Sequence, residues 1–216
     1  MKSSTMRIRE APDSNRHARN LKEPDMNAIR TSRPATVTLA AVLHFAIALA
    51  FASIPLIGLI YGADIQAAAE AEIARQGGEP GALAVAGLRF DEHGLAIWAP
   101  FAIAAAIGLL GGFILAGRRA ARVLSWIVLP LVLAGNALIM ASNATAAEKI
   151  QSLFDASGEA GLRGIDAAAF LKAAYAAYPG WLPALEGVRF AVILIGCVLG
   201  VFLLALRPAR AHFAKR

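Results

Sequence analysis

Four long runs of apolar residues constrain this chain more than any other feature of its sequence. Together they contain no Asp, Glu or Lys, and their single Arg stands at the start of the last run. As a helix, each run can cross a hydrocarbon core of about 30 Å, because a helix rises about 1.5 Å per residue. The runs cover about residues 35–61, 95–117, 123–143 and 188–206. The sequence therefore predicts an all-α fold, a bundle of four transmembrane helices.

The basic residues are concentrated at one end of the predicted spans. The segment before the first run holds eight Lys or Arg, residues 118–122 hold three and residues 207–216 hold four, whereas the connections 62–94 and 144–187 are acidic in balance. Lys and Arg near span ends favour the cytoplasmic side. We therefore expect both termini in the cytoplasm of a multi-pass plasma-membrane protein, and both long loops outside. The net charge of +6 then indicates topology and not a nucleic-acid partner.

The predicted organisation is a membrane domain with a tail at each end. Residues 1–34 are polar and rich in Arg, so we expect a disordered basic cytoplasmic tail. Residues 35–206 form the four-helix membrane domain with its two outward loops. Residues 207–216 form a second basic cytoplasmic tail.

The outward loops have patterns that predict a small helical cap outside the cell. The first span is expected to continue as helix to Arg75 and the third to Ala156, until glycines interrupt them. Asp166 is placed to cap a further helix that ends at Tyr178. Gly81–Gly94 is typical of a loop or a short strand, and Ala82–Phe90 is the only stretch in it that we expect to be extended.

Each half of the chain repeats the order span, outward Ala-rich segment, span. Ile65–Gln66 and Ile150–Gln151 occupy similar places in the two halves. The abundance of Ala in both segments is enough to explain this correspondence, and an internal duplication is the alternative explanation.

Small residues recur at a spacing of four in the second and fourth spans. Residues of this size let helix backbones approach closely. We expect them to pack helices within the bundle, with homo-oligomerisation or docking to another membrane protein as the alternatives. The set consists of Ala104, Gly108, Gly112 and Ala116 in the second span, and Gly196 and Gly200 in the fourth.

Two strongly polar side chains lie deep inside the predicted spans. His44 is in the first run and Asn136 in the third. Each is expected to form an interhelical hydrogen bond, worth about 0.6–2 kcal/mol. The alternative is that both face a polar cavity or relay protons. Whether the two side chains meet depends on the helix register, which the sequence leaves open.

The remaining reactive residues have structural explanations. Asp91-Glu92-His93 is the densest cluster of potential metal ligands, but three consecutive loop residues seldom converge on one ion, so we expect solvated charge. Glu186 and Arg189 are expected to form an ion pair or to snorkel, with a ligand-binding vestibule as the alternative. Cys197 lies within a span and is expected to behave as a small apolar residue. No catalytic, cofactor-binding or metal-binding residue is predicted.

The first span opens with the stretch Arg33-Pro-Ala-Thr-Val-Thr38. In this stretch and in its architecture the chain resembles the uncharacterised, Ala-rich, four-span integral membrane proteins of actinobacteria, whose first span often begins with Arg-Pro-x-Thr-Val-Thr. The resemblance implies a bacterial plasma membrane, and it carries no catalytic residue over to this chain.

These observations favour a non-enzymatic integral membrane protein that acts through protein or lipid interactions. Ion-coupled transporters usually need several ionisable residues at membrane depth, and the spans offer one histidine. The sequence contains no Ser–His–Asp set, phosphate loop or Cys pair that would indicate a known chemistry. The expected partners are the lipid bilayer and a second copy or another membrane protein. The alternative is a small-solute or lipid permease or channel in which His44 and Asn136 face a cavity.

Overall fold

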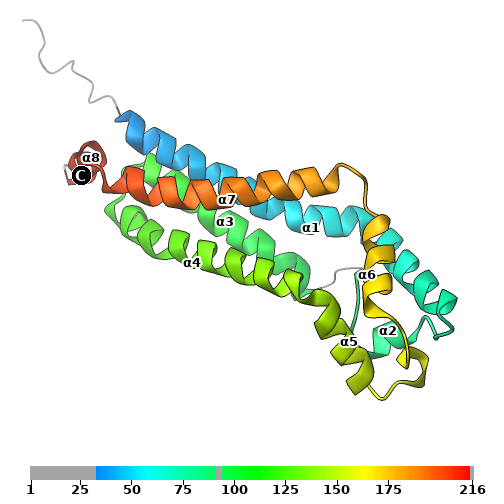
Figure 1. The fold of residues 1–216 in the computed structure, drawn as a ribbon. Helices are drawn as coiled ribbons and strands as arrows, with labels where there is room; N and C mark the ends of the chain where they lie inside the picture. The colour runs from blue at the N-terminus through cyan, green and yellow to red at the C-terminus, as the bar shows by residue number, and fades with distance from the viewer. Residues whose placement is uncertain (1–32, 91–93, 215–216) are drawn as a thin grey trace, which may run out of the picture. The chain divides into compact units, whose positions relative to one another are not determined.

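The computed structural model of this chain describes residues 33–90 and 94–214, and it is helical with no strand over these ranges (Figure 1). The chain separates into two units, Met1–Arg33 and Pro34–Arg216, and every described helix belongs to the second. The predicted disordered tail, apart from its last two residues, and the cluster Asp91-Glu92-His93 lie outside the described residues.

Four of the described helices are long and apolar enough to cross a membrane. This confirms the predicted all-α architecture with four helices of membrane length. Within the bundle, α1 packs against α3 and α7, and α4 packs against α7 and α3 (Figure 1). The four helices are α1 (Ala35–Arg75), α3 (Leu95–Leu115), α4 (Arg119–Ala144) and α7 (Leu182–Ala205).

The first helix, α1, is a single helix of 41 residues. At about 1.5 Å per residue it is roughly 60 Å long, about twice the hydrocarbon thickness. It therefore continues well past the apolar run 35–61, as predicted. It ends where Gly77 adopts a φ of 86°. The Gly77 N–H then bonds the Ala74 carbonyl at 3.0 Å and the Gly78 N–H bonds the Ile73 carbonyl at 2.9 Å, the hydrogen-bond pair of a Schellman motif.

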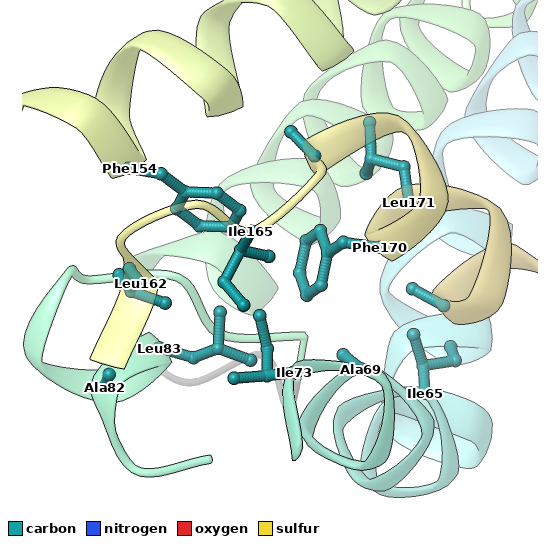
Figure 2. Packing of buried hydrophobic residues seen from close by; sticks show 12 residues of the cluster. Ile65, Ala69, Ile73, Ala82, Leu83, Phe154, Leu162, Ile165, Phe170 and Leu171 are labelled. Atoms are coloured by element: carbon teal, nitrogen blue, oxygen red, sulfur yellow. The ribbon is translucent and has the colours of Figure 1, made fainter. Parts of the chain in front are cut away.

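The segments between the apolar helices form a second packed unit, which we call the loop module. Its elements are the end of α1, α2 (Ala82–Val85), α5 (Ala146–Ala156), the 3-10 helix η4 (Ala160–Leu162) and α6 (Ala167–Ala176). Each element contributes at least one buried apolar side chain to a common core (Figure 2). These buried residues are Ile65, Ala69, Ile73, Ala82, Leu83, Phe154, Leu162, Ile165, Ala167, Phe170, Leu171 and Ala174.

The segment Ala82–Phe90 begins with the helical turn α2, so its expectation as an extended segment is corrected. Ala82 and Leu83 are both buried, and the next two residues are exposed. An extended segment would place adjacent side chains on opposite faces. A helical turn lets both side chains enter the same core.

Aromatic side chains fill the centre of the loop module. Phe170 is fully buried, and its ring lies edge-on to that of Phe154 at a centroid distance of 5.5 Å (Figure 2). It is also tilted to the ring of Phe90 at a centroid distance of 5.9 Å. Edge-on pairs of this kind add to the stabilisation from burial. The three rings join segments that are far apart in the sequence.

Two glutamines connect the helices of the loop module to the segments that follow. The Gln66 Oε1 atom accepts the Phe90 N–H at 2.9 Å, and the Gln151 Oε1 atom accepts the Ala167 N–H at 3.0 Å. Each Nε2 atom also donates to the acidic residue four positions later in its own helix, at 2.7 and 3.3 Å. The two positions that correspond in the sequence therefore make corresponding contacts, and each supplies a partner to a backbone N–H group.

The start of α6 is fixed by its predicted cap. The Asp166 carboxylate accepts the N–H groups of Ala168 and Ala169 at 2.8 and 3.2 Å, which confirms its assignment as N-cap. The Asp166 N–H in turn donates to the Gln76 Oε1 atom at 2.7 Å. This bond joins the end of α1 to the start of α6.

An ion pair completes the end of α1. Glu72 lies eleven residues beyond the apolar run 35–61 and pairs with Arg75 at 2.5 Å. Gln76 also donates to the Glu72 carboxylate, at 2.8 Å. The hydrogen bonds from Arg75 and Gln76 lower the pKa of Glu72 to about 2.

A short helix, α8 (Arg207–Ala214), follows α7 in the segment predicted as a basic tail. Ala209 and Phe213, four residues apart, are buried in a core with Val37 and Ala40 from the start of α1. This spacing places both on one helical face. The C-terminal segment is therefore packed against the bundle.

Candidate functional site

His44 lies at the polar centre of the helix bundle. Its side chain is fully buried. The Nδ1 atom lies 2.7 Å from the Ala40 carbonyl oxygen and the Nε2 atom 3.0 Å from the Ser125 Oγ atom. A carbonyl oxygen only accepts hydrogen bonds, so the Nδ1 atom carries a proton. The contact with Ser125 joins α1 to α4.

The Ser125 hydroxyl group has two acceptors for one proton. Ser125 is also fully buried, and its Oγ atom donates to the Ala121 carbonyl at 2.8 Å. In a neutral ring with a proton on Nδ1, the Nε2 atom of His44 is an acceptor. The hydroxyl proton then serves either Nε2 or the carbonyl oxygen. A neutral imidazole therefore allows two of the three hydrogen bonds at any moment, and a second ring proton would allow all three.

Glycines on two further helices make room for the imidazole. A Cβ atom added at Gly111 of α3 would lie 3.1 Å from the His44 Cβ atom. One added at Gly200 of α7 would lie 3.9 Å from the His44 Cε1 atom and 2.8 Å from the Leu129 Cδ1 atom. Residues from all four membrane-length helices therefore meet at His44.

Asn136 lies on α4 away from this centre. It stands eleven residues after Ser125, a separation of about 16 Å along the helix. Its buried Nδ2 atom has no hydrogen-bond partner among the described residues. The structure thus pairs His44 with Ser125 and leaves Asn136 apart. In the sequence, Ser125 could be noticed as a polar residue within an apolar run. Serine is common in membrane helices, however, so its presence alone does not identify it as the partner of His44.

The predicted small residues of α3 divide between two faces. Ala104 is buried, and a Cβ atom on Gly108 would lie 3.8 Å from the Ala48 Cβ atom. Gly112 has nothing within 4 Å of such an atom, and Ala116 is exposed. Each step of four residues rotates the helix surface by about 40°, so a row with this spacing leaves the interface.

The contact face of α3 instead alternates steps of three and four residues. Ile107, Gly111 and Ile114 are buried along this face. Steps of this mixed spacing stay on one side of a helix that has about 3.6 residues per turn. Gly111 is therefore the close-approach glycine that the sequence reasoning missed.

The two predicted glycines of α7 both lie at close helix contacts. A Cβ atom added at Gly196 would lie 3.1 Å from two side-chain atoms of Ile47, and Gly200 faces Leu129 and His44. Cys197 is buried beside them. The α7 glycines thus pack against α1 and α4.

Two adjoining hollows lie where the loop module meets the bundle. Their volumes are about 180 and 330 Å³, and Tyr178, Leu182 and Glu186 line both. Arg89 and Arg189 line the smaller one. No ion pair within 4.0 Å joins the described residues Glu186 and Arg189. The hollows therefore offer charged groups of both signs together with aromatic walls.

No family model, curated protein or solved structure matches this chain. Its class follows from the helices alone: four helices that are long and apolar enough to cross a bilayer indicate a multi-pass membrane protein.

Proposed function

We propose that this chain is a non-enzymatic integral protein of the plasma membrane whose loop module docks a protein partner. In this proposal the N- and C-termini lie in the cytoplasm and the loop module lies outside, because Lys and Arg are concentrated at the opposite ends of the spans. The bundle acts as the membrane anchor and the loop module as the binding element.

The observation that carries the proposal is the loop module itself. It has its own apolar core, and the uninterrupted helix α1 connects that core to the bundle. A rigid unit loses little conformational freedom when it binds a partner. Apolar and aromatic side chains remain exposed near it, including Val85 at 69%, Tyr175 at 54% and Trp181 at 51%. Aromatic groups of this kind are enriched in protein interfaces.

The geometry gives the permease alternative no comparable support. In that alternative His44 and Asn136 face a cavity. His44 is fully buried, both its ring nitrogens lie within hydrogen-bond distance of a partner in the bundle, and Gly111 and Gly200 pack against it. In this conformation the imidazole holds helices together, which is a structural role.

A photo-crosslinking experiment in living cells tests the docking role. A photoreactive residue replaces Val85 or Tyr175 on the loop module, and Leu131, which is 69% exposed on α4, in a matched control. We expect a discrete protein adduct from the two module positions and lipid adducts from the control. Lipid adducts alone from all three positions would refute protein docking.

Thiol labelling tests the orientation separately. In a Cys197→Ala background, Val85→Cys and Ala160→Cys should react with an impermeant thiol reagent in intact cells. Asn20→Cys should react only after the cells are opened. The reverse pattern would place the loop module in the cytoplasm and overturn the proposed topology.

A further inference from the structure

A basic hollow lies at the end of the bundle opposite the loop module. Its volume is about 320 Å³. Three guanidinium groups, from two helices, line it together with apolar side chains. The lining residues are Arg119, Arg122, Val123, Arg210, Phe213 and Ala214.

Helix ends hold two of these arginines in place. The Arg119 Nε atom donates to the Phe213 carbonyl at 2.6 Å, and its Nη2 atom donates to the Ala214 carbonyl. The Arg122 Nε atom donates to the Leu204 carbonyl at 3.0 Å. Each guanidinium group has further N–H donors beyond those used here. These two arginines are therefore positioned before any ligand binds.

The hollow lacks an acidic counterpart in the segments that build it. Residues 118–122 and 207–214 contain no Asp or Glu, and neither do the neighbouring helix α3 or the first half of α4. Three like charges that line one hollow repel each other. An anion bound between them would remove this repulsion, and the first backbone N–H groups of α4, whose N-cap makes no side-chain hydrogen bond, add to the attraction.

An apolar surface starts at the rim of the hollow. Val123 lines the hollow and is 60% exposed, and Ile127, one turn further along α4, is 61% exposed. The Arg122 guanidinium lies over the Trp126 ring, 4.9 Å from its centroid. An anionic group with an attached hydrocarbon chain matches both the basic hollow and the apolar surface beside it. A free anion would contact only the hollow.

We infer that the hollow binds the phosphate group of an anionic membrane phospholipid. Arg119, Arg122 and Arg210 contact the phosphate oxygens, and an acyl chain lies along Val123 and Ile127. Arginine suits this task because its planar fork matches phosphate oxygens. The site lies at the other end of the bundle from the loop module, so its failure and that of the proposed docking function are separate results.

Arg210 offers the sharpest test, because it is exposed and makes none of the helix-end hydrogen bonds described for the other two. Arg207→Gln is the matched control, since Arg207 is exposed on the same helix and does not line the hollow. The full chain is titrated in detergent with short-chain phosphatidylglycerol, short-chain phosphatidylcholine or inorganic phosphate. Thermal stabilisation and the lipid retained in native mass spectrometry are the readouts.

We expect phosphatidylglycerol to bind more tightly than phosphatidylcholine. Arg210→Gln should raise the half-saturating phosphatidylglycerol concentration roughly tenfold, as expected for the loss of one charge-assisted hydrogen bond, and Arg207→Gln should leave it within about twofold, as expected for a distant surface charge. Equal effects of the two substitutions would show only general charge attraction and would overturn the inference. Stabilisation by inorganic phosphate alone, equal in size and dependent on Arg210, would assign the site to a soluble anion and overturn the lipid assignment.

Discussion

The contact between Gly78 and Gly161 allows a sharp test of how the loop module is held together. A Cβ atom added at Gly78 would lie 2.2 Å from the Gly161 carbonyl oxygen. It would also lie 2.9 Å from the Ile73 Cγ2 atom and 3.0 Å from the Ile165 Cδ1 atom. The Gly161 carbonyl accepts the Glu79 N–H at 3.3 Å, so two loops that are far apart in the sequence meet here without side chains between them.

The substitution Gly78→Ala should therefore destabilise the loop module by about 2–4 kcal/mol. Carbon and oxygen atoms in favourable contact lie about 3.3–3.6 Å apart, so the added carbon would be about 1 Å too close to the carbonyl. The two isoleucine side chains can rotate away, but the carbonyl belongs to the backbone. Its displacement weakens a hydrogen bond worth about 0.5–1.5 kcal/mol, and overpacking adds about 1–3 kcal/mol.

The matched control is Gly81→Ala, three residues further along the same loop. Gly81 has a φ of −60°, and nothing lies within 4 Å of an added Cβ atom. Alanine adopts this conformation without strain, so we expect no destabilisation and a gain of up to about 1 kcal/mol from reduced freedom in the unfolded chain.

Trypsin cleavage after Arg75, in the last turn of α1, measures local opening of the loop module, because the helical backbone must unfold locally before a protease can cleave it. When opening and closing are fast, the cleavage rate reports the free energy of opening. Gly78→Ala should raise the rate roughly 30-fold or more, and Gly81→Ala should not raise it. Cleavage of Gly78→Ala at the wild-type rate would show that the two loops are not in contact, and the reasoning would fail.

Three further predictions concern the bundle and the end of α1. A double-mutant cycle of Ser125→Ala and His44→Ala in thermal or denaturant unfolding should give a coupling free energy of about 0.6–1.7 kcal/mol, and a value of zero would deny the interhelical hydrogen bond. Gly111→Leu should destabilise the bundle by about 1–3 kcal/mol because α1 packs against that position, and Gly112→Leu should change stability by less than about 0.5 kcal/mol; equal melting temperatures for the two variants would contradict the assigned helix face. The depressed pKa of Glu72, about 2, means that its stabilising contribution is present above its ordinary pKa and is lost as the pH falls toward 2. Protease resistance of the loop module should therefore fall over that range in the wild type, with a smaller fall in Glu72→Gln, and identical profiles would remove Glu72 as the cause.

Strong local signals made much of this fold predictable. Four helices of membrane length can be predicted from the length of the apolar runs and from their near-complete lack of charge. An uncompensated charge in hydrocarbon is costly, so an apolar run of this length clearly indicates a membrane-spanning helix. The end of α1 follows from Gly77, which takes the left-handed conformation that a helix end requires. Asp166 could be predicted as the N-cap of a helix because its short side chain can accept hydrogen bonds from the first backbone N–H groups of that helix.

The centre of the bundle was less predictable because it depends on helix rotation. His44 stood out as a polar residue, but its partner Ser125 lies 81 residues away. Only the packing of α3 and α7 against both α1 and α4 brings the two side chains together. The choice between Gly111 and Gly112 is a rotation of about 100°, which an apolar helix hides because hydrophobic residues cover all its faces. The pattern of apolar residues cannot show which face of a membrane helix contacts its neighbours, because lipid and protein are equally favourable surroundings for an apolar side chain.

The three cores of the molecule share one helix, and this determines how a perturbation can spread. Only α1, among the described helices, contributes buried residues to the loop module core, to the core around Ile47 and to the core around Phe213. Substitutions at distant sites without shared partners add in free energy. The effects on the free energy of unfolding of a substitution in the loop module and of one in the basic hollow should therefore add, unless one of the substitutions bends or rotates α1. Non-additivity between Gly78→Ala and Arg210→Gln would consequently point to coupling through α1, which contributes to the cores at both ends, whereas additivity would mean that the loop module and the basic hollow respond independently.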